Sequence, residues 1–239
     1  MKAIFLKDLT QLFGSPLAWV LLAVDQFVLA WIFLVLLDRF QAMQGNLEIG
    51  VTAAVITPLF LNAAIIALFI TPLLSMHGFA AERRSGALDL LLSSPASMTG
   101  IVVGRYAALL GWLLFSALLT GAMAWSLSLG AQLDHGLLFA GLLALLSCLA
   151  LYAAISLLLS TFGGQPAAVA AASIGVLLLL WLVGNATTSD GTFAWLGLEG
   201  HFSRLSAGRL GVADSGYFVI LTLAALGAAI FQLNRLRES

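Results

Sequence analysis

Six long apolar runs constrain this chain of 239 residues more than any other feature. They cover residues 17–38, 52–76, 106–129, 136–161, 166–186 and 216–233. A helix of about twenty residues crosses the ~30 Å hydrocarbon core of a bilayer. The chain is 62% hydrophobic and 9% charged, with a mean hydropathy of +1.08, more apolar surface than a water-soluble domain of this length can bury. The sequence therefore predicts one all-α polytopic membrane domain over residues 1–239, with six transmembrane helices.

Charge and composition also argue against several functions. The net charge of −1 gives no basic field for nucleic acid. A single cysteine, Cys148, allows no intrachain disulfide, and His77, His135 and His201 lack the spacing of metal ligands. The sequence has no phosphate-binding loop of the Walker type. We therefore expect no metal, cofactor or catalytic residue in this chain, and any ATP must bind another subunit.

Residues 1–15 have the pattern of an amphipathic helix. Phe5, Leu9 and Leu12 share one face, and polar residues occupy the other face (Lys2, Lys7, Asp8 and Gln11). We expect this helix to lie in the cytoplasmic interface. A cleavable signal peptide is the rival interpretation, but the apolar run that follows is too long and no small-x-small site succeeds it.

The densest charge cluster lies in residues 77–97, between the second and third apolar runs. Glu82, Arg83 and Arg84 are adjacent, so this stretch cannot lie in the hydrocarbon. The leucines that follow make it too apolar for an ordinary solvated loop. Glu82 and Asp89 are seven residues apart, or two helical turns, so both carboxylates fit on one helical face. We predict a surface helix, ended by Pro95, whose polar face meets a partner; the alternative is a positive-inside loop with interfacial leucines.

The distribution of Lys and Arg predicts the orientation. With the N-terminus inside, seven lie in cytoplasmic segments (Lys2, Lys7, Arg83, Arg84, Arg105, Arg235 and Arg237) and three in outer segments (Arg39, Arg204 and Arg209). The positive-inside rule then places both termini in the cytoplasm.

Two polar residues within the apolar runs have open interpretations. Asp25 in the first run costs about 2.5–3.5 kcal/mol at a central depth. It either faces a substrate cavity or proton path, or hydrogen-bonds with Gln26 or a neighbouring helix; we favour the second interpretation. Asn62 in the second run raises the same question, and Pro58 and Pro72 are expected to kink that helix.

Two further segments predict packing and surface structure. Small residues fill positions 167–175 and 224–229, which favours close helix approach within the bundle or across a dimer. Residues 187–215 form a long outer segment that mixes aromatic and polar side chains, so we expect re-entrant or interfacial helices there. Within it we mark His201 and Asp214.

Two motifs carry a family resemblance. The first is Glu82-x-x-x-Gly86-x-Leu88-Asp89-Leu90-Leu91-Leu92-x-x-Pro95, and the second is His201-Phe202 … Gly208 … Asp214-x-x-Tyr217-Phe218. With the six-span layout, they resemble the ABC-2 type permease family, closest to the small gliding-motility type permeases, over nearly the whole chain. Asp89 and Ala87 depart mildly from the family pattern, in which Glu and Thr are more usual.

The resemblance implies a function and partners. Residues 77–97 would contain a cytoplasmic coupling helix (Glu82, Arg83, Arg84, Gly86, Leu88, Asp89 and Pro95) that docks on a separate ATPase carrying ATP and Mg. The chain would be the permease half of an exporter in a bacterial inner membrane, paired with a second or related permease. One alternative is an ion- or proton-coupled carrier using Asp25. Another is a membrane enzyme acting on lipid, although the sequence lacks the carboxylate pair or His/Asp cluster expected of one.

Overall fold

A computed structural model describes residues 2–43, 50–76, 79, 97–163, 165–186, 195–209 and 211–238. The regular elements of these residues are helices, so the predicted all-α fold is confirmed. The α-helices are α1 (Lys2–Gly14), α2 (Pro16–Met43), α3 (Thr57–Ser75), α6 (Met98–Ser126), α7 (His135–Thr161), α8 (Pro166–Ala186), α10 (Leu198–Ser206) and α11 (Val212–Glu238). A π-helical turn, η1 (Thr52–Ile56), precedes α3, and a 3-10 turn, η2 (Leu127–Leu129), follows α6.

Six of these segments are long and apolar enough to cross a membrane, as the sequence predicts. They are Pro16–Ala42, Thr52–Ser75, Met98–Leu129, His135–Thr161, Pro166–Val183 and Val212–Arg237. The main difference is at the third span, which begins at Met98 instead of residue 106. Arg105 interrupts the apolar pattern of its first turns, so the sequence pattern predicts a later start.

Local chemistry explains where several helices begin and end. The Ser97 side chain accepts a hydrogen bond of 3.2 Å from the Gly100 backbone N–H and caps α6, and Asp134 accepts one of 3.1 Å from Leu137 N–H and caps α7. Pro16 opens α2 and Pro166 opens α8, the helix position that tolerates proline best. Between α7 and α8, Gly163 has φ of 77°, a backbone conformation that favours glycine.

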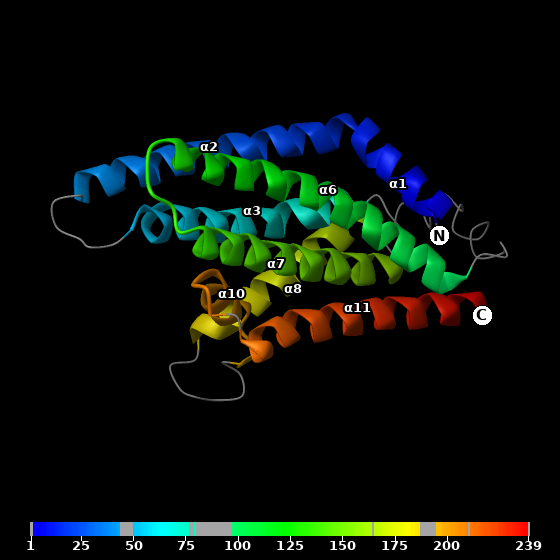
Figure 1. Cartoon of the computed structure of the whole chain (residues 1–239). Coiled ribbons are helices and arrows are strands. Elements are labelled where there is room, and N and C mark those ends of the chain that lie inside the picture. Colours follow the sequence, from blue (N-terminus) through cyan, green and yellow to red (C-terminus); the bar gives the residue numbers. More distant parts are fainter. Residues whose placement is uncertain are drawn as a thin grey trace.

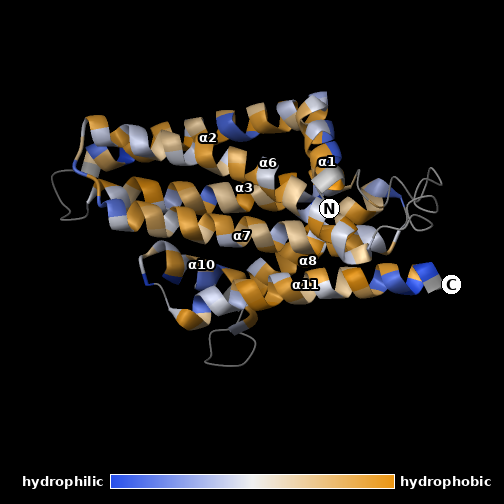
Figure 2. Cartoon of the chain, turned by 45° about the vertical axis from the view of Figure 1, so that its right-hand side comes forward, coloured by the Kyte–Doolittle hydropathy of each residue, from blue (hydrophilic) through white to orange (hydrophobic). Residues whose placement is uncertain are grey.

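The six spans form a bundle around α7. Helix α7 contacts α3, α6, α8, α10 and α11. In the apolar part of α7, 56% of the residues are buried, against 17% in the apolar part of α2. Both termini lie at the same end of the bundle, and α10 lies at the opposite end (Figure 1). We call these the termini end and the α10 end. Hydrophobic residues run along the spans, and hydrophilic residues gather where α11 finishes (Figure 2).

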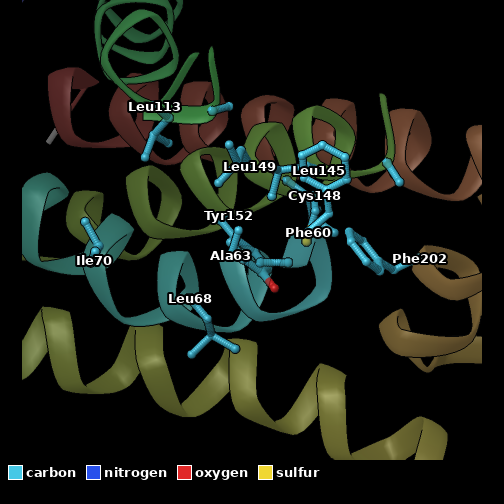
Figure 3. Packing of buried hydrophobic residues seen from close by; sticks show 14 of the residues in the cluster. Phe60, Ala63, Leu68, Ile70, Leu113, Leu145, Cys148, Leu149, Tyr152 and Phe202 are labelled. Carbon is cyan, nitrogen blue, oxygen red and sulfur yellow. The ribbon is translucent and has the colours of Figure 1, made fainter. Parts of the chain in front are cut away.

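The densest packing is between α3 and α7. Phe60, Cys148 and Tyr152 lie in this interface, and Phe202 of α10 reaches toward it (Figure 3). At Gly141 the helices come so close that an added Cβ would lie 2.5 Å from Phe60 Cδ2. The Tyr152 hydroxyl also accepts a hydrogen bond from Trp181 Nε1 of α8. The core is thus continuous from α3 through α7 to α8.

The prolines of the second span lie at different places in the helix. Pro58 falls in the first turn of α3, directly after the π-helical turn η1, and Pro72 lies inside α3. Proline at the start of a helix removes no required hydrogen bond, whereas Pro72 removes one from the interior. The predicted kink at Pro58 and Pro72 stays a prediction, and of the two residues only Pro72 lies inside the helix.

The small residues of α8 and α11 lie on two faces of each helix. One face of each helix is buried in the bundle, with Ala170 and Ser173 on α8 and Ala229 on α11. The other face is exposed in this single chain (Ala168, Ala171 and Ala172 on α8; Ala224, Gly227 and Ala228 on α11). The predicted close helix approach within the bundle is found on the first face only.

Candidate functional site

A charged pair joins α1 to α6 at the termini end. Arg105 Nε lies 3.5 Å from Asp8 Oδ2, and the Arg105 side chain is only 6% exposed. The sequence placed Arg105 in a cytoplasmic segment, but Ser97 starts the helix early enough for Arg105 to lie in its third turn. Arg105 is therefore a buried helix residue that ties the N-terminal amphipathic helix to the third span.

Phe79 completes this contact from the other side. The Arg105 guanidinium lies 4.1 Å from the centre of the Phe79 ring, a cation–π contact. Phe79 is buried and belongs to a cluster with Met98, Val102 and Leu233. Phe79 precedes the Glu82–Pro95 motif and Met98 follows it, so residues on both sides of that motif pack together at the termini end.

Most of the predicted coupling helix lies outside the described residues. This holds for Glu82, Arg83, Arg84, Gly86, Leu88, Asp89 and Pro95. Their role stays a prediction. The structure describes helices and side chains on either side of them.

A cavity of about 580 Å³ lies beside the charged pair. Five helices line it: α1, α2, α3, α6 and α7. Asp8, Arg105 and Ser75 give it polar groups, and Leu12 and Leu157 are among its apolar ones. The sequence did not predict this cavity, because the residues that form it are scattered along the chain.

Asp25 lies in a polar cluster between α2 and α6. Its Oδ2 accepts hydrogen bonds from Ser116 Oγ at 2.7 Å and from Gln26 Nε2 at 3.1 Å, and Asp25 is 6% exposed. Gln26 Nε2 also lies 3.3 Å from Thr120 Oγ1. The favoured interpretation expected hydrogen bonds to Gln26 or a neighbouring helix, and both are present.

The space beside Asp25 is small. The cavity that it lines has a volume of about 20 Å³, about the size of one water molecule. Asn62, the other polar residue noted within a span, donates a hydrogen bond of 2.8 Å to the Pro58 carbonyl one turn earlier in its own helix. The small cavity beside Asp25 has no room for a solute, and the side chain of Asn62 is bound within its own helix.

The two marked residues of the outer segment meet at the α10 end. His201 Nδ1 lies 2.6 Å from Asp214 Oδ1, and Arg204 contacts the same oxygen through Nε at 2.9 Å and Nη2 at 2.7 Å. His201 Nε2 lies 2.7 Å from the Trp195 carbonyl oxygen, which can only accept, so Nε2 carries a hydrogen. This cluster holds the short helix α10 against the start of α11.

Aromatic rings cover the same cluster. The Tyr217 ring stacks on His201 with centroids 4.1 Å apart and planes at 15°, and its hydroxyl donates to the Leu196 carbonyl at 2.8 Å. Trp195 contacts both rings edge-on. Sequence reasoning marked His201 and Asp214 but missed Arg204, whose spacing of one helical turn after His201 was the available signal.

The described part of the chain has no group of three or more His, Cys, Asp or Glu residues placed to hold a metal ion. The cluster at the α10 end has one histidine and one carboxylate, with an arginine in the position of a counterion. Its chemistry is that of a structural ion pair.

Comparison with known protein families and with curated proteins found no match to this chain. The class that the fold defines is a polytopic all-α membrane protein with six candidate spans.

Proposed function

We propose that this chain is the membrane-spanning permease subunit of an ATP-binding cassette exporter of the ABC-2 type. The support is the six-span layout preceded by the amphipathic helix α1, together with the Glu82–Pro95 motif and the His201–Asp214 motif. A separate cytoplasmic ATPase binds ATP and Mg and drives movement of the substrate. The chain itself contributes no catalytic residue.

One observation carries the proposal furthest: the charged stretch is bounded by residues that pack together at the termini end. Phe79 and Met98 share a buried cluster with Leu233 of α11. Phe79 also contacts Arg105 of α6, which pairs with Asp8 of α1. A partner that moves this stretch would therefore act on α1, α6 and α11 together.

These contacts support the following proposed mechanism. ATP closes two ATPase subunits, and the Glu82–Leu92 helix passes that movement through Phe79 and Arg105 to the spans. Glu82 and Asp89 bind basic or amide groups of the partner. Arg83 and Arg84 bind its acidic groups or lipid phosphates.

A second permease subunit completes the pathway, since six spans form only half of it. In this single chain the apolar face of α2 is exposed, including Phe27 and Trp31. The small-residue faces of α8 and α11 are exposed as well. These faces offer room for lipid and for the second copy.

The proposed orientation places the termini end in the cytoplasm of a bacterial inner membrane. Lys7 lies in α1, which begins at this end, and Arg235 and Arg237 lie in the last turn of α11, which finishes there. Arg39 of α2 and Arg204 of α10 lie toward the α10 end. The positive-inside rule favours the cytoplasm for the end with more cationic residues.

The test is to purify the chain in mild detergent and measure ATP hydrolysis by the chains that accompany it. Loss of one charge-assisted contact costs about 1.5–3 kcal/mol, which is tenfold or more in affinity. Glu82→Ala and Gly86→Leu should therefore reduce the recovered ATPase at least tenfold while insertion is unchanged. Glu238→Ala, at the end of α11, is the matched control and should recover as much ATPase as wild type. If Glu82→Ala recovers full ATPase while Arg83→Ala and Arg84→Ala invert the topology, the stretch is a positive-inside loop and not a coupling helix.

A further inference from the structure

We propose that a single water molecule binds in the core beside Asp25, where it completes the hydrogen bonds of this carboxylate and links the first span to the third. The proposal rests on a carboxylate oxygen that has no partner among the described residues and on a cavity of matching size. The site is formed by this chain alone, so it does not depend on a partner ATPase.

Asp25 has unused hydrogen-bonding capacity. Its Oδ2 accepts hydrogen bonds from Ser116 Oγ at 2.7 Å and from Gln26 Nε2 at 3.1 Å. Its Oδ1 has no donor in the part of the chain that the structure describes. Both oxygens of a carboxylate accept hydrogen bonds, so one oxygen of Asp25 is left for a further donor.

The surroundings of Asp25 make this missing bond costly. Asp25 is 6% exposed and lies well inside the span Pro16–Ala42, where bulk water is absent. A buried polar atom without a partner costs free energy, and in folded proteins an ordered water often supplies the missing hydrogen bond. Asp25 should therefore hold a water molecule wherever there is room for one.

The cavity beside Asp25 has this room. Its volume is about 20 Å³, above the roughly 10–15 Å³ that one water molecule needs. Asp25, Ser116 and Thr120 are the polar residues with oxygen atoms in its wall. The cavity lies among α2, α3, α6 and α7, and Figure 3 shows three of its lining residues (Ile70, Leu113 and Leu149).

The indole of Trp112 offers the water a donor. Trp112 lines the cavity and is 2% exposed, and its Nε1–H has no acceptor among the described residues. Water can accept from this N–H while it donates to Asp25 Oδ1 and to the hydroxyl oxygen of Thr120. Three hydrogen bonds are typical of a buried water.

The same wall is poorly suited to a metal ion. Ca²⁺ and Mg²⁺ take about six or more oxygen ligands, whereas only three side chains of the cavity wall carry oxygen. The number of polar groups therefore favours water over a cation.

The water strengthens the attachment of the least buried span. Only 17% of the apolar part of α2 is buried, the lowest share among the six candidate spans. The side-chain hydrogen bonds described between α2 and α6 all involve Asp25 or Gln26. A water that bridges Asp25 to Trp112 of α6 adds a link at this same level.

The experiment is hydroxyl-radical footprinting of the full chain in detergent, with the radicals made from water by X-rays. Radicals that form from a bound water oxidise the side chains beside it, and mass spectrometry locates the oxidised residues. Trp181 lies outside the cavity and is 8% exposed, against 2% for Trp112, so radicals from bulk water should reach Trp181 more easily. The proposal predicts the reverse order in wild type, with Trp112 oxidised more than Trp181.

Four variants sharpen the result. Ala67→Val fills the cavity that Ala67 lines, and Asp25→Leu removes the carboxylate; each should lower the oxidation of Trp112 to the level of Trp181. Asp25→Asn should keep the oxidation of Trp112, because an amide also binds water. Ala171→Val, at an exposed position of α8 outside the cavity, is the matched control and should behave like wild type.

Three results would overturn the proposal. One is oxidation of Trp112 no greater than that of Trp181 in wild type, which decides the question even if a variant does not fold. Another is unchanged oxidation of Trp112 in both Ala67→Val and Asp25→Leu. The third is oxidation of wild-type Trp112 that rises when Na⁺ in the buffer is replaced by choline, because a cation would then occupy the site.

Discussion

The two ends of this bundle are built differently. At the α10 end, Asp214 makes contacts of 2.6–2.9 Å with His201 and Arg204, and the Tyr217 ring stacks 4.1 Å above His201. At the termini end, Asp8 and Arg105 are 3.5 Å apart beside a cavity of about 580 Å³. An aspartate and an arginine thus pair at both ends, within a tight cluster at one end and beside a cavity at the other.

From this difference we infer that the α10 end stabilises the fold, whereas the termini end takes part in binding. A carboxylate oxygen with several short contacts to cationic groups stabilises the fold, as Asp214 Oδ1 does with His201 and Arg204. The Asp8–Arg105 pair lies beside a large cavity and against Phe79, which comes just before the charged residues proposed to meet the ATPase. Substitutions at the α10 end should therefore lower the free energy of unfolding. Substitutions at the termini end should instead weaken binding of the proposed partner.

The largest loss of stability is expected from Gly141→Leu, where α7 meets α3. A Cβ at Gly141 would lie 2.5 Å from Phe60, so the helices must separate, at a cost of about 3 kcal/mol in the free energy of unfolding. Unfolding of the purified chain by denaturing detergent measures this. Gly216→Leu in α11 is the control, since no atom lies within 4 Å of its Cβ position, and it should unfold like wild type. Equal stability of both variants would contradict the packing between α3 and α7.

Asp214→Asn should have the next largest effect. The variant keeps the shape of the side chain but loses the charge that binds Arg204 and His201, and we expect about 2 kcal/mol less stability by the same measurement. Arg204 is 46% exposed, which keeps the loss well below that of a fully buried pair. Asp134→Asn is the matched control at this end, because asparagine caps α7 as well as aspartate does. A loss no larger than that of the control would mean that the cluster does not fasten α10.

Asp25→Asn should have the smallest effect of the three. Its partners are the neutral groups of Ser116 and Gln26, and asparagine can still accept from Ser116. We expect a loss of about 1 kcal/mol or less, with normal assembly and ATP hydrolysis within a few-fold of wild type. Collapse of coupled activity with assembly intact would instead favour the ion-coupled carrier.

Much of the fold could be predicted from the sequence because it depends on local patterns. Apolar runs of span length located all six helices, and the amphipathic pattern located α1. The helix of the third span begins at Met98, before the apolar run, because the cationic Arg105 interrupts the local apolar pattern. A buried Arg105 depends on Asp8 and Phe79, which are distant in sequence, and no local pattern reports such a pairing.

The candidate sites could be predicted only in part, for the same reason. A motif in the sequence indicates His201 and Asp214. The ion pair of Arg204 and the stacking of the Tyr217 ring depend instead on how α10 packs on α11. The cavity at the termini end is lined by five helices that are distant in sequence, so no local pattern predicts it. The hydrogen bond from Gln26 to Asp25 could be expected because the two residues are adjacent, whereas the choice of Ser116 could not.

The most direct test of the proposed function is photocrosslinking from each end of the bundle. A photoreactive amino acid is placed at Ser85, in the charged stretch, and in a separate variant at Ser203, an exposed residue of α10. After illumination of membranes, the account predicts that Ser85 crosslinks to a chain that hydrolyses ATP and that Ser203 does not. Crosslinking of that chain from Ser203, or its absence from Ser85 in an assembled and active protein, would contradict the claim that an ATPase drives this permease from the termini end.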